Sequence, residues 1–249
     1  MYDVTAGQVL FEEYAHEKRA PASLTKLVTA LVALKYSTPE TVFTVGRELE
    51  FVQAGSSLAL IQQRQRLTLE QLLYGLLLPS GNDASYTIAT NVGRIIQPNA
   101  QTHQAAVSAF VGAMNAYCAA IGMTESHFAN PDGWDDPDQY TTAHDLRLLA
   151  EAALADPLIQ TIVRTENKLV VFASGEQITW HNSNKLLNPK SGFYQPTCIG
   201  IKTGTTDSAG ECLVSAFDRT DRFIVVVLNC ESDEARYRYT AELLQAYGS

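Results

Sequence analysis

The spacing of apolar residues changes twice along this chain, and that change limits the folds it can adopt. Short segments with the two-residue period of strands lie near both ends, and segments with the 3.6-residue period of helices lie between them. Strands so far apart in sequence bury their apolar faces most simply in one shared sheet. We therefore expect an α+β fold, in which an antiparallel sheet formed by both chain termini is flanked by helices and lies beside a mainly helical block.

Turn residues and helix caps give approximate bounds for these segments. Strands are expected at Tyr2–Val4, Val9–Tyr14, Leu169–Ala173, Gln177–Trp180, Cys198–Thr203, Gly210–Phe217 and Arg222–Asn229. Helices are expected at Ser23–Tyr36, from Thr68 to about Leu78, from Asp83 to about Ile96, at Gln101–Gly122, after Thr142, and from Ser232 to about Tyr247. Thr68 and Thr142 each open a capping-box pattern. We expect one domain over residues 1–249, with a helical lobe of about residues 40–165 inserted between the sheet-forming ends.

One uncharged stretch, from Ala105 to Met123, is long enough to raise the question of a membrane span. Its larger apolar residues recur at helical spacing on one face, and Ser108 and Asn115 interrupt it. We expect a helix with one buried face and no membrane span in this chain. The first residues, Met1–Val4, lack the basic and apolar character of a signal peptide, so the chain is expected to be either cytoplasmic or a mature domain whose signal has been removed.

The charge balance and the cysteines exclude several functions. The chain has 18 Lys and Arg against 27 Asp and Glu, a formal net charge of −9, so no nucleic-acid partner is expected. The four cysteines form no C-x-x-C pair and the five histidines form no H-E-x-x-H, so no metal and no cofactor is predicted. The cysteines are expected to be free thiols. The acidic stretch from Asp132 to Asp138 is interpreted as a solvated loop.

The first pattern that could carry chemistry is Ser23-x-x-Lys26, at the start of an expected helix. Residues three apart lie on the same helical face, so the hydroxyl and the amine can meet. A serine becomes a nucleophile when a base takes its proton, and a lysine serves as that base when burial or a nearby cation lowers its pKa. The pattern occurs about once by chance in a chain of this length, so it also fits a surface serine and lysine.

Two further patterns follow along the chain. Ser80-Gly81-Asn82 lies between two expected helices, where a hydroxyl and an amide could relay a proton and bind a carbonyl, although these are also ordinary turn residues. Lys202-Thr203-Gly204 ends an expected strand, where a cation and a hydroxyl could bind a carboxylate and the glycine would let a substrate backbone lie against the strand edge. All three patterns occur together in this order in roughly one chain in a hundred by chance.

This combination resembles the serine D-alanyl-D-alanine carboxypeptidases, which are the low-molecular-weight penicillin-binding proteins. The similarity runs from about Val4 to Leu244 and includes the segments Ala22–Leu27, Leu72–Ala84, Phe128–Gly133, Tyr140–Leu146, Asn182–Leu187 and Gly200–Thr206. It implies the fold of penicillin-binding proteins and class A β-lactamases, and removal of the terminal D-alanine from peptidoglycan stem peptides. It also implies β-lactams as covalent inhibitors and an extracytoplasmic location that is secreted, periplasmic or cell-wall-facing.

The resemblance gives each matching residue an implied role. Ser23 would be the nucleophile that forms an acyl-enzyme, Lys26 would activate it, and Ser80 would pass a proton to the leaving D-alanine. The backbone N–H groups of Ser23 and Thr205 would form the oxyanion hole. The implied substrate-binding residues are Asn82 for the amide and Lys202, Thr203, Gly204 and Thr205 for the terminal carboxylate and the strand edge.

Two positions differ from some family members, and three other functions stay open. Ser183 stands where some members have arginine, and Thr205 lies at a variable position, so carboxylate recognition could differ. The β-rich second domain and the amphipathic anchor of many members are not expected in this chain.

A β-lactamase is disfavoured because no glutamate between Ser80 and Lys202 lies in an E-x-x-x-N pattern. The second open function is that of a D,D-endopeptidase, and the third is that of a non-catalytic penicillin-sensing domain.

Overall fold

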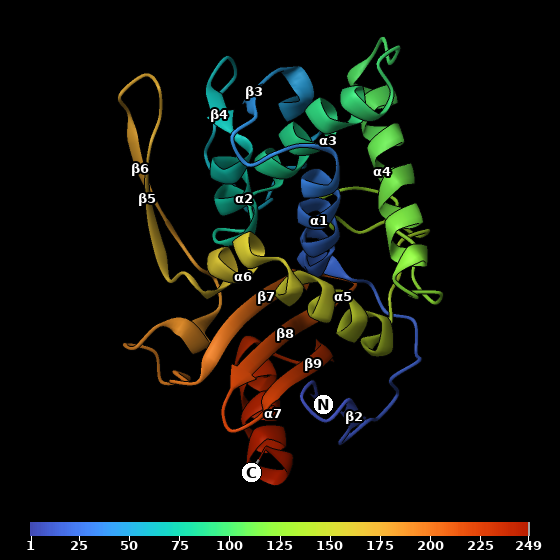
Figure 1. Cartoon of the computed structure of the whole chain (residues 1–249), viewed down its shortest axis with the longest axis vertical. Coiled ribbons are helices and arrows are strands. Elements are labelled where there is room, and N and C mark those ends of the chain that lie inside the picture. Colours follow the sequence, from blue (N-terminus) through green and yellow to red (C-terminus); the bar gives the residue numbers. More distant parts are fainter. Residues whose placement is uncertain (249) are drawn as a thin grey trace.

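The computed structural model describes residues 1–248 and has the expected α+β architecture. Its main sheet has five antiparallel strands in the order β2-β1-β9-β8-β7. These strands are β1 (Tyr2–Asp3), β2 (Gln8–Val9), β7 (Cys198–Thr206), β8 (Gly210–Asp218) and β9 (Arg222–Cys230). Two come from the start of the chain and three from its end, and both termini lie beside this sheet in Figure 1. The prediction of a sheet built from both termini is therefore confirmed.

Helices cover both faces of the sheet. One face packs against α7 (Asp233–Tyr247), and the other packs against α5 (Ala143–Ala155) and α6 (Pro157–Arg164). Ser232 accepts a hydrogen bond from the backbone N–H of Ala235 and so begins α7 as expected. The sheet thus has a separate apolar core on each of its faces.

The helical block lies beyond α5 and α6 and contains α1 (Lys26–Tyr36), α2 (Leu69–Leu77), α3 (Asn82–Ile96) and α4 (His103–Ala120). Helix α1 is the central member, because it packs against the other three helices and α5. Its first eight residues, from Lys26 to Ala33, are all buried. The apolar side chains of this helix therefore fill the core of the block, where each fully buried leucine stabilises the fold by about 1.5–3 kcal/mol.

Several sequence-based expectations need correction. The strands expected near Leu169 and Gln177 form a separate hairpin of β5 (Asn167–Val171) and β6 (Gln177–His181), which projects from the body in Figure 1 instead of joining the main sheet. The sequence did not predict helix α6 or the small ladder formed by β3 (Val42–Thr44) and β4 (Arg66–Thr68). These strands have only three residues each, too few to show a clear period.

The two capping-box patterns behave differently. Thr68 and Gln71 form the complete reciprocal box that opens α2. Thr142 caps α5 by accepting the N–H of Asp145, but the Asp145 carboxylate accepts hydrogen bonds from the Glu125 N–H and the Ser126 hydroxyl instead. The second box is therefore only half formed, because tertiary partners compete for its carboxylate.

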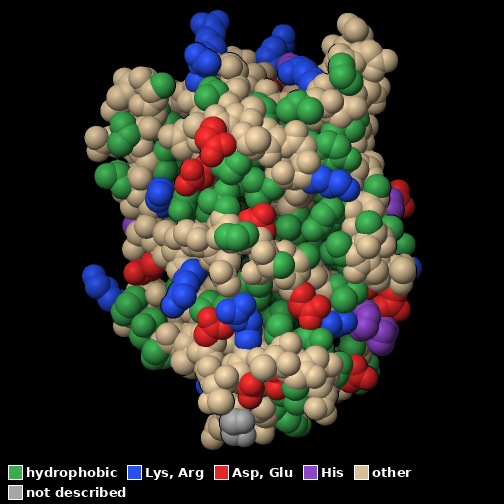
Figure 2. All heavy atoms as spheres, in the orientation of Figure 1, with side chains coloured by type: hydrophobic (Ala, Val, Ile, Leu, Met, Phe, Trp, Pro, Cys, Tyr) green, Lys and Arg blue, Asp and Glu red, His purple; other side chains and the backbone are tan. Residues whose placement is uncertain are grey.

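The cysteines and the uncharged helix agree with expectation. All four cysteines are buried free thiols, and Cys198 lies opposite Phe217 in the β7–β8 ladder, far from Cys212 in register. Burial raises the pKa of the Cys118 thiol to about 12, which makes it a poor nucleophile. Helix α4 buries one face, and within residues 1–248 no helix combines the length and apolarity needed to cross a membrane. On the face drawn in Figure 2, basic and acidic side chains are intermingled.

Candidate active site

The side chains of Ser23 and Lys26 meet at the start of α1. A 3-10 turn, η1 (Ala22–Thr25), precedes the helix, so the helix expected from Ser23 has a tighter first turn than predicted. The Nζ atom of Lys26 lies 2.8 Å from the Ser23 Oγ, within hydrogen-bond distance. Lys26 is fully buried, whereas Ser23 is only partly buried and can be approached from outside.

The turn that carries Ser23 is held in an unusual backbone conformation. Ala22 has a φ of 47°, which non-glycine residues rarely adopt. Gly133, with a φ of 90°, packs so closely against it that a Cβ at residue 133 would lie 1.9 Å from the Ala22 carbonyl oxygen. Gly133 is therefore required for the loop after Pro131 to approach the nucleophile turn.

That same loop supplies the second partner of Lys26. The Lys26 Nζ donates a hydrogen bond of 2.6 Å to the backbone carbonyl oxygen of Asp132. Asp132 is itself 1% exposed, so the interpretation of this residue as part of a solvated acidic loop is wrong. Burial raises the pKa of its carboxyl group, and the nearby Lys26 acts in the opposite direction. The remaining acidic residues of the stretch are more exposed, and Asp135 accepts a hydrogen bond from the Thr206 hydroxyl.

Burial also changes the acidity of Lys26. It lowers the pKa of the Lys26 amine to about 8, although the carboxylates of Asp132 and Asp83 partly oppose the shift. A lysine with a pKa near 8 is neutral in a substantial fraction of molecules near pH 7.5, and only the neutral amine can accept a proton. The Ser23–Lys26 pair therefore has both the geometry and the acidity of a nucleophile with its base.

Lys202 and Ser80 form the second half of the cluster. The Lys202 Nζ donates hydrogen bonds of 2.9 Å to the Ser80 Oγ and 2.9 Å to the Thr203 carbonyl oxygen. Ser80 lies between α2 and α3 and has a φ of 64°. Burial, followed by the nearby charges of Lys26 and Arg236, lowers the pKa of Lys202 well below its usual value. Two buried amines so close together resist being charged at the same time.

Strand β7 carries the Lys-Thr-Gly segment along the outer edge of the sheet. The strand continues to Thr206, so Lys202, Thr203 and Gly204 lie within it, whereas the prediction placed them at its end. The ladder with β8 explains the extension, since Thr205 pairs with Glu211 beyond the glycine. Because β7 has no neighbour on its other side in residues 1–248, that side can accept an extended substrate.

Gly204 and Thr203 have distinct surroundings on this strand. A Cβ at residue 204 would lie 3.0 Å from the Cβ of Ala22 and 3.2 Å from the Ser23 nitrogen, so this glycine lets β7 approach the nucleophile turn. The Thr203 hydroxyl lies 2.6 Å from the Ser183 hydroxyl. Ser183, the residue singled out as a departure from part of the family, therefore contacts the predicted carboxylate-binding threonine directly.

Asn82 and Asp83 connect the site to the loop of residues 56–61. The Asn82 side-chain amide donates to the Ser56 Oγ at 2.9 Å, and its backbone N–H donates to the Ser57 carbonyl oxygen at 2.8 Å. The buried Asp83 carboxylate accepts backbone N–H groups of Ala59 at 2.8 Å and Ile61 at 3.1 Å. Its role as the anchor of this loop was not predicted from sequence, because its partners lie more than 20 residues away.

Arg236 is a second residue that sequence reasoning missed. It extends from α7, is 7% exposed, and donates through its NH1 group to the Gly204 carbonyl oxygen at 3.3 Å and the Thr205 Oγ1 at 3.2 Å. The same guanidinium pairs with Glu211 at 2.7 Å. Nothing in the local sequence of α7 points to β7, so only the packing of this helix on the sheet could reveal the contact.

The structure thus brings the three sequence patterns to one place. Ser23 and Lys26 come from α1 and its preceding turn, Ser80 from the α2–α3 connection, Asn82 from the start of α3, and Lys202 from β7. Gly204 touches the Ser23 turn, and the Lys202 amine joins β7 to Ser80. Within the described part of the chain, no group of three or more His, Cys, Asp or Glu side chains is arranged to hold a metal ion.

Comparison with known proteins agrees with this geometry. The sequence model of the family described as D-alanyl-D-alanine carboxypeptidase matches residues 1–232, which is most of the chain. This chain belongs to the D-alanyl-D-alanine carboxypeptidase family. It is 33% identical over 260 residues to the D-alanyl-D-alanine carboxypeptidase DacD of Salmonella typhimurium, a match that covers 98% of this chain and 60% of DacD. The chain therefore spans well under two thirds of the length of that relative.

Solved structures of this family have the same fold. The crystal structure of the DD-transpeptidase of Streptomyces strain K15 matches with a TM-score of 0.88 at 31% identity, covering 98% of this chain and 94% of that one. The D-alanyl-D-alanine carboxypeptidase DacD of Francisella tularensis matches with a TM-score of 0.82 at 28% identity, covering 98% and 68% of the two chains. The fold expected from the family resemblance is confirmed.

Proposed function

We propose that this protein is a serine-type D-Ala-D-Ala carboxypeptidase that removes the terminal D-alanine from peptidoglycan stem peptides through an acyl-enzyme on Ser23. The observation that carries the proposal is the 2.8 Å contact between the Ser23 Oγ and the amine of Lys26, which burial holds at a pKa of about 8. A nucleophile beside a base of matched acidity is the requirement for acyl transfer. Membership of the family supports the same reaction and substrate.

In the proposed acylation step, the neutral Lys26 amine accepts the Ser23 proton as the Oγ bonds to the carbonyl carbon of the penultimate D-alanine. The bond from that carbon to the nitrogen of the terminal D-alanine then breaks, and the nitrogen gains the proton that Lys26 took up, passed on through Ser80, which contacts Lys202. Lys26 is then neutral again. Water later attacks the ester, which restores the Ser23 hydroxyl and releases the shortened peptide. The backbone N–H groups of Ser23 and Thr205 are proposed to stabilise the oxyanion, a contribution worth about 10²–10³ in rate for each donor.

The substrate is proposed to lie along the free edge of β7. Lys202, Thr203 and Thr205 would face its terminal carboxylate, and Gly204 allows the close approach. An arriving carboxylate would favour the charged form of Lys202, whose pKa is otherwise lowered by burial and by Lys26. Arg236, which already contacts Thr205, adds positive charge at the same end of the strand. Asn82 would hold the substrate amide on the opposite side.

Three further proposals concern the location of the protein, its domain organisation and its inhibitors. Peptidoglycan lies outside the cytoplasmic membrane, so we propose an extracytoplasmic location. We propose that residues 1–249 act as one catalytic domain, and that the part of the expected helical lobe (about residues 40–165) that carries Ser80 and Asn82 forms one wall of the site. β-Lactams are proposed to acylate Ser23 as covalent inhibitors, because they present a reactive carbonyl and a carboxylate in one molecule.

The test combines intact-mass measurement with product analysis. Benzylpenicillin should add its mass once to the protein, peptide mapping should place the label on Ser23, and Ser23→Ala should remain unlabelled. A stem pentapeptide ending in D-Ala-D-Ala should release free D-alanine with the wild-type protein only. Rapid turnover of penicillin would instead indicate a β-lactamase, and activity confined to cross-linked muropeptides would indicate a D,D-endopeptidase. Penicillin binding without any hydrolysis would indicate a sensing domain.

A further inference from the structure

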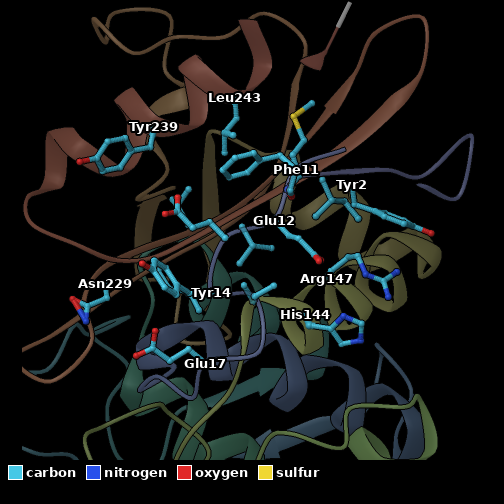
Figure 3. A pocket seen from close by; sticks show the side chains of 18 of the residues that line it. Tyr2, Phe11, Glu12, Tyr14, Glu17, His144, Arg147, Asn229, Tyr239 and Leu243 are labelled. Atoms are coloured by element: carbon cyan, nitrogen blue, oxygen red, sulfur yellow. The ribbon is translucent and has the colours of Figure 1, made fainter. Parts of the chain in front are cut away.

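A cavity of about 700 Å³ lies between strand β9, the start of α5 and helix α7, and Figure 3 shows Tyr14, His144 and Tyr239 among the residues that line it. None of the residues proposed to act on the stem peptide lines this cavity. The contacts that position the reacting groups must therefore lie at the other edge of the sheet, where the Ser23 turn meets β7.

The two N–H groups proposed to form the oxyanion hole belong to segments far apart in the sequence. Ser23 lies in the turn η1, and Thr205 lies near the end of β7. The two segments touch at Gly204, where an added Cβ would lie 3.2 Å from the Ser23 nitrogen. Donors stabilise an oxyanion only within about 2.7–3.1 Å of its oxygen. A shift of the end of β7 relative to the Ser23 turn would therefore separate the two donors from one common oxygen.

The carboxylate of Asp135 holds the end of β7. One of its oxygens accepts a hydrogen bond of 2.6 Å from the Thr206 hydroxyl, and the other accepts the backbone N–H of Ser208 at 3.1 Å. The Thr206 hydroxyl in turn accepts the N–H of Ala209 at 3.0 Å. Asp135 thus binds the last residue of β7 together with the turn that follows it, and Thr205 is the neighbour of that fixed residue.

The same loop also reaches the Ser23 turn. Gly133 lies two residues before Asp135, and an added Cβ at Gly133 would lie 2.9 Å from the Ser23 nitrogen. Two residues of extended chain span at most about 7 Å. One short segment therefore joins the turn that carries the first donor to the strand that carries the second.

Hydrogen bonds within the loop make this segment rigid. The Gly133 N–H donates to the Asn130 Oδ1 at 2.8 Å. The Trp134 carbonyl oxygen accepts two hydrogen bonds of 2.9 Å, one from the Asn130 Nδ2 and one from the Gln139 Nε2. Gln139 is 5% exposed, so this contact is protected from water. The backbone between Gly133 and Asp135 is fixed from behind and can act as a brace.

The charge of Asp135 argues against a role in holding the substrate. The strand end beside it is proposed to receive the terminal carboxylate of the stem peptide, and a second negative group would repel that carboxylate. Both oxygens of Asp135 instead accept hydrogen bonds from the end of β7 and the turn after it. The aspartate therefore serves the strand and not the ligand.

We propose that Asp135 is a positioning residue, which holds Thr206 so that the N–H groups of Thr205 and Ser23 converge on one oxyanion. This inference rests on the proposed function, because it concerns the transition state of that reaction. The oxyanion develops only during acylation, so loss of the brace should slow acylation without weakening the binding of the substrate before reaction.

The experiment measures acylation of Asp135→Asn by benzylpenicillin in a stopped-flow instrument. The variant keeps the shape of the side chain but replaces one accepting oxygen with an N–H donor. Its limiting acylation rate should fall about tenfold or more, and the half-saturating concentration should not rise. A boronic acid analogue of an acyl-D-alanine, whose boron bonds to the Ser23 Oγ and becomes tetrahedral, should bind more weakly by a similar factor.

The pH profile separates this role from a general loosening of the site. The Lys26 amine contacts the carbonyl oxygen of Asp132 and not Asp135, so the pH of half-maximal acylation should be the same in Asp135→Asn as in the wild type. Thr206→Val removes the other partner of the same hydrogen bond. Its effect should resemble that of Asp135→Asn, and the two effects should not add in the double variant.

Asp138→Asn is the matched control. It makes the same charge change in the same acidic stretch, where the exposed Asp138 carboxylate accepts no hydrogen bond from the described residues, and it should behave as the wild type. Wild-type rates in Asp135→Asn would overturn the proposal. So would a shifted pH profile, or a raised half-saturating concentration with an unchanged limiting rate. A wild-type protein that penicillin does not acylate would instead contradict the proposed function itself, and this inference with it.

Discussion

Lys26 and Asp132 are 106 residues apart in sequence, yet the Lys26 Nζ donates a hydrogen bond of 2.6 Å to the Asp132 carbonyl oxygen. A neutral amine has two N–H groups and one lone pair, so donation to this carbonyl helps direct the lone pair toward the Ser23 hydroxyl 2.8 Å away. Asp132 therefore orients the amine of Lys26, the proposed base, through its backbone, and Gly133 beside it lets the loop come so close.

The first prediction concerns the pH dependence of acylation. Because neutral Lys26 is the proposed active form and its pKa is about 8, the second-order rate constant for acylation by benzylpenicillin should rise about tenfold per pH unit below pH 7.5 and level off above pH 8.5. Stopped-flow measurements from pH 5.5 to 9.5 give the profile. Lys26→Arg cannot lose its proton in this range and should be slower by about 10²–10⁴ without the rise. A flat wild-type profile would contradict the role given to Lys26.

The second prediction concerns the Gly133 contact. Gly133→Ala places a Cβ 1.9 Å from the Ala22 carbonyl oxygen at a φ of 90°, so it should destabilise the protein by about 3 kcal/mol or more and lower the melting temperature by roughly 10 °C. Gly112→Ala is the matched control, because no atom lies within 4 Å of its added Cβ and it is inside α4. That variant should be neutral or stabilised by about 0.5–1 kcal/mol. Calorimetry of both variants tests the comparison.

The third prediction concerns the loop anchored by Asp83. Asp83→Asn removes the charge that accepts the Ala59 and Ile61 N–H groups, so it should lower the free energy of unfolding by about 2–3 kcal/mol. Since the same loop contacts Asn82, the KM for the stem peptide should rise more than kcat falls. Asp136→Asn, at an exposed position, is the control. Equal stability of the two variants in urea would show that Asp83 does not anchor the loop.

The fourth prediction concerns Thr203 and Ser183, whose hydroxyls lie 2.6 Å apart. Thr203→Val removes a hydroxyl proposed to face the substrate carboxylate, so KM should rise about five- to tenfold, the effect of roughly 1–1.5 kcal/mol of hydrogen bonding. Ser183→Ala leaves Thr203 in place and should raise KM less. The exposed turn residue Thr220, changed to Val, should leave the kinetics as in the wild type. Steady-state release of D-alanine measures all three variants.

Local sequence was sufficient to predict those features that depend on residues close together along the chain. Ser23 and Lys26 are three residues apart in the first turns of one helix, so their contact follows from helical geometry alone. The complete capping box at Thr68 and the cap at Ser232 likewise depend on residues three positions away. The family resemblance then added the expectation that Ser80 and Lys202 join this pair, which no local rule could provide.

Local rules failed where distant partners compete for the same groups. The end of β7 was predicted at Thr203, but pairing with β8 carries the strand to Thr206. Asp132 belongs to an acidic stretch that looked solvated, and it is buried because its loop packs on the Ser23 turn.

The sequence by itself determined the helix and strand periods, the pairing of Ser23 with Lys26 and the order of the three patterns, because these depend on spacing along one chain. Only the tertiary structure decided that Lys26 is buried enough for its pKa to fall to about 8 and that Arg236 contacts Thr205. Burial and desolvation depend on which distant segments pack together, and a linear sequence does not specify those distances.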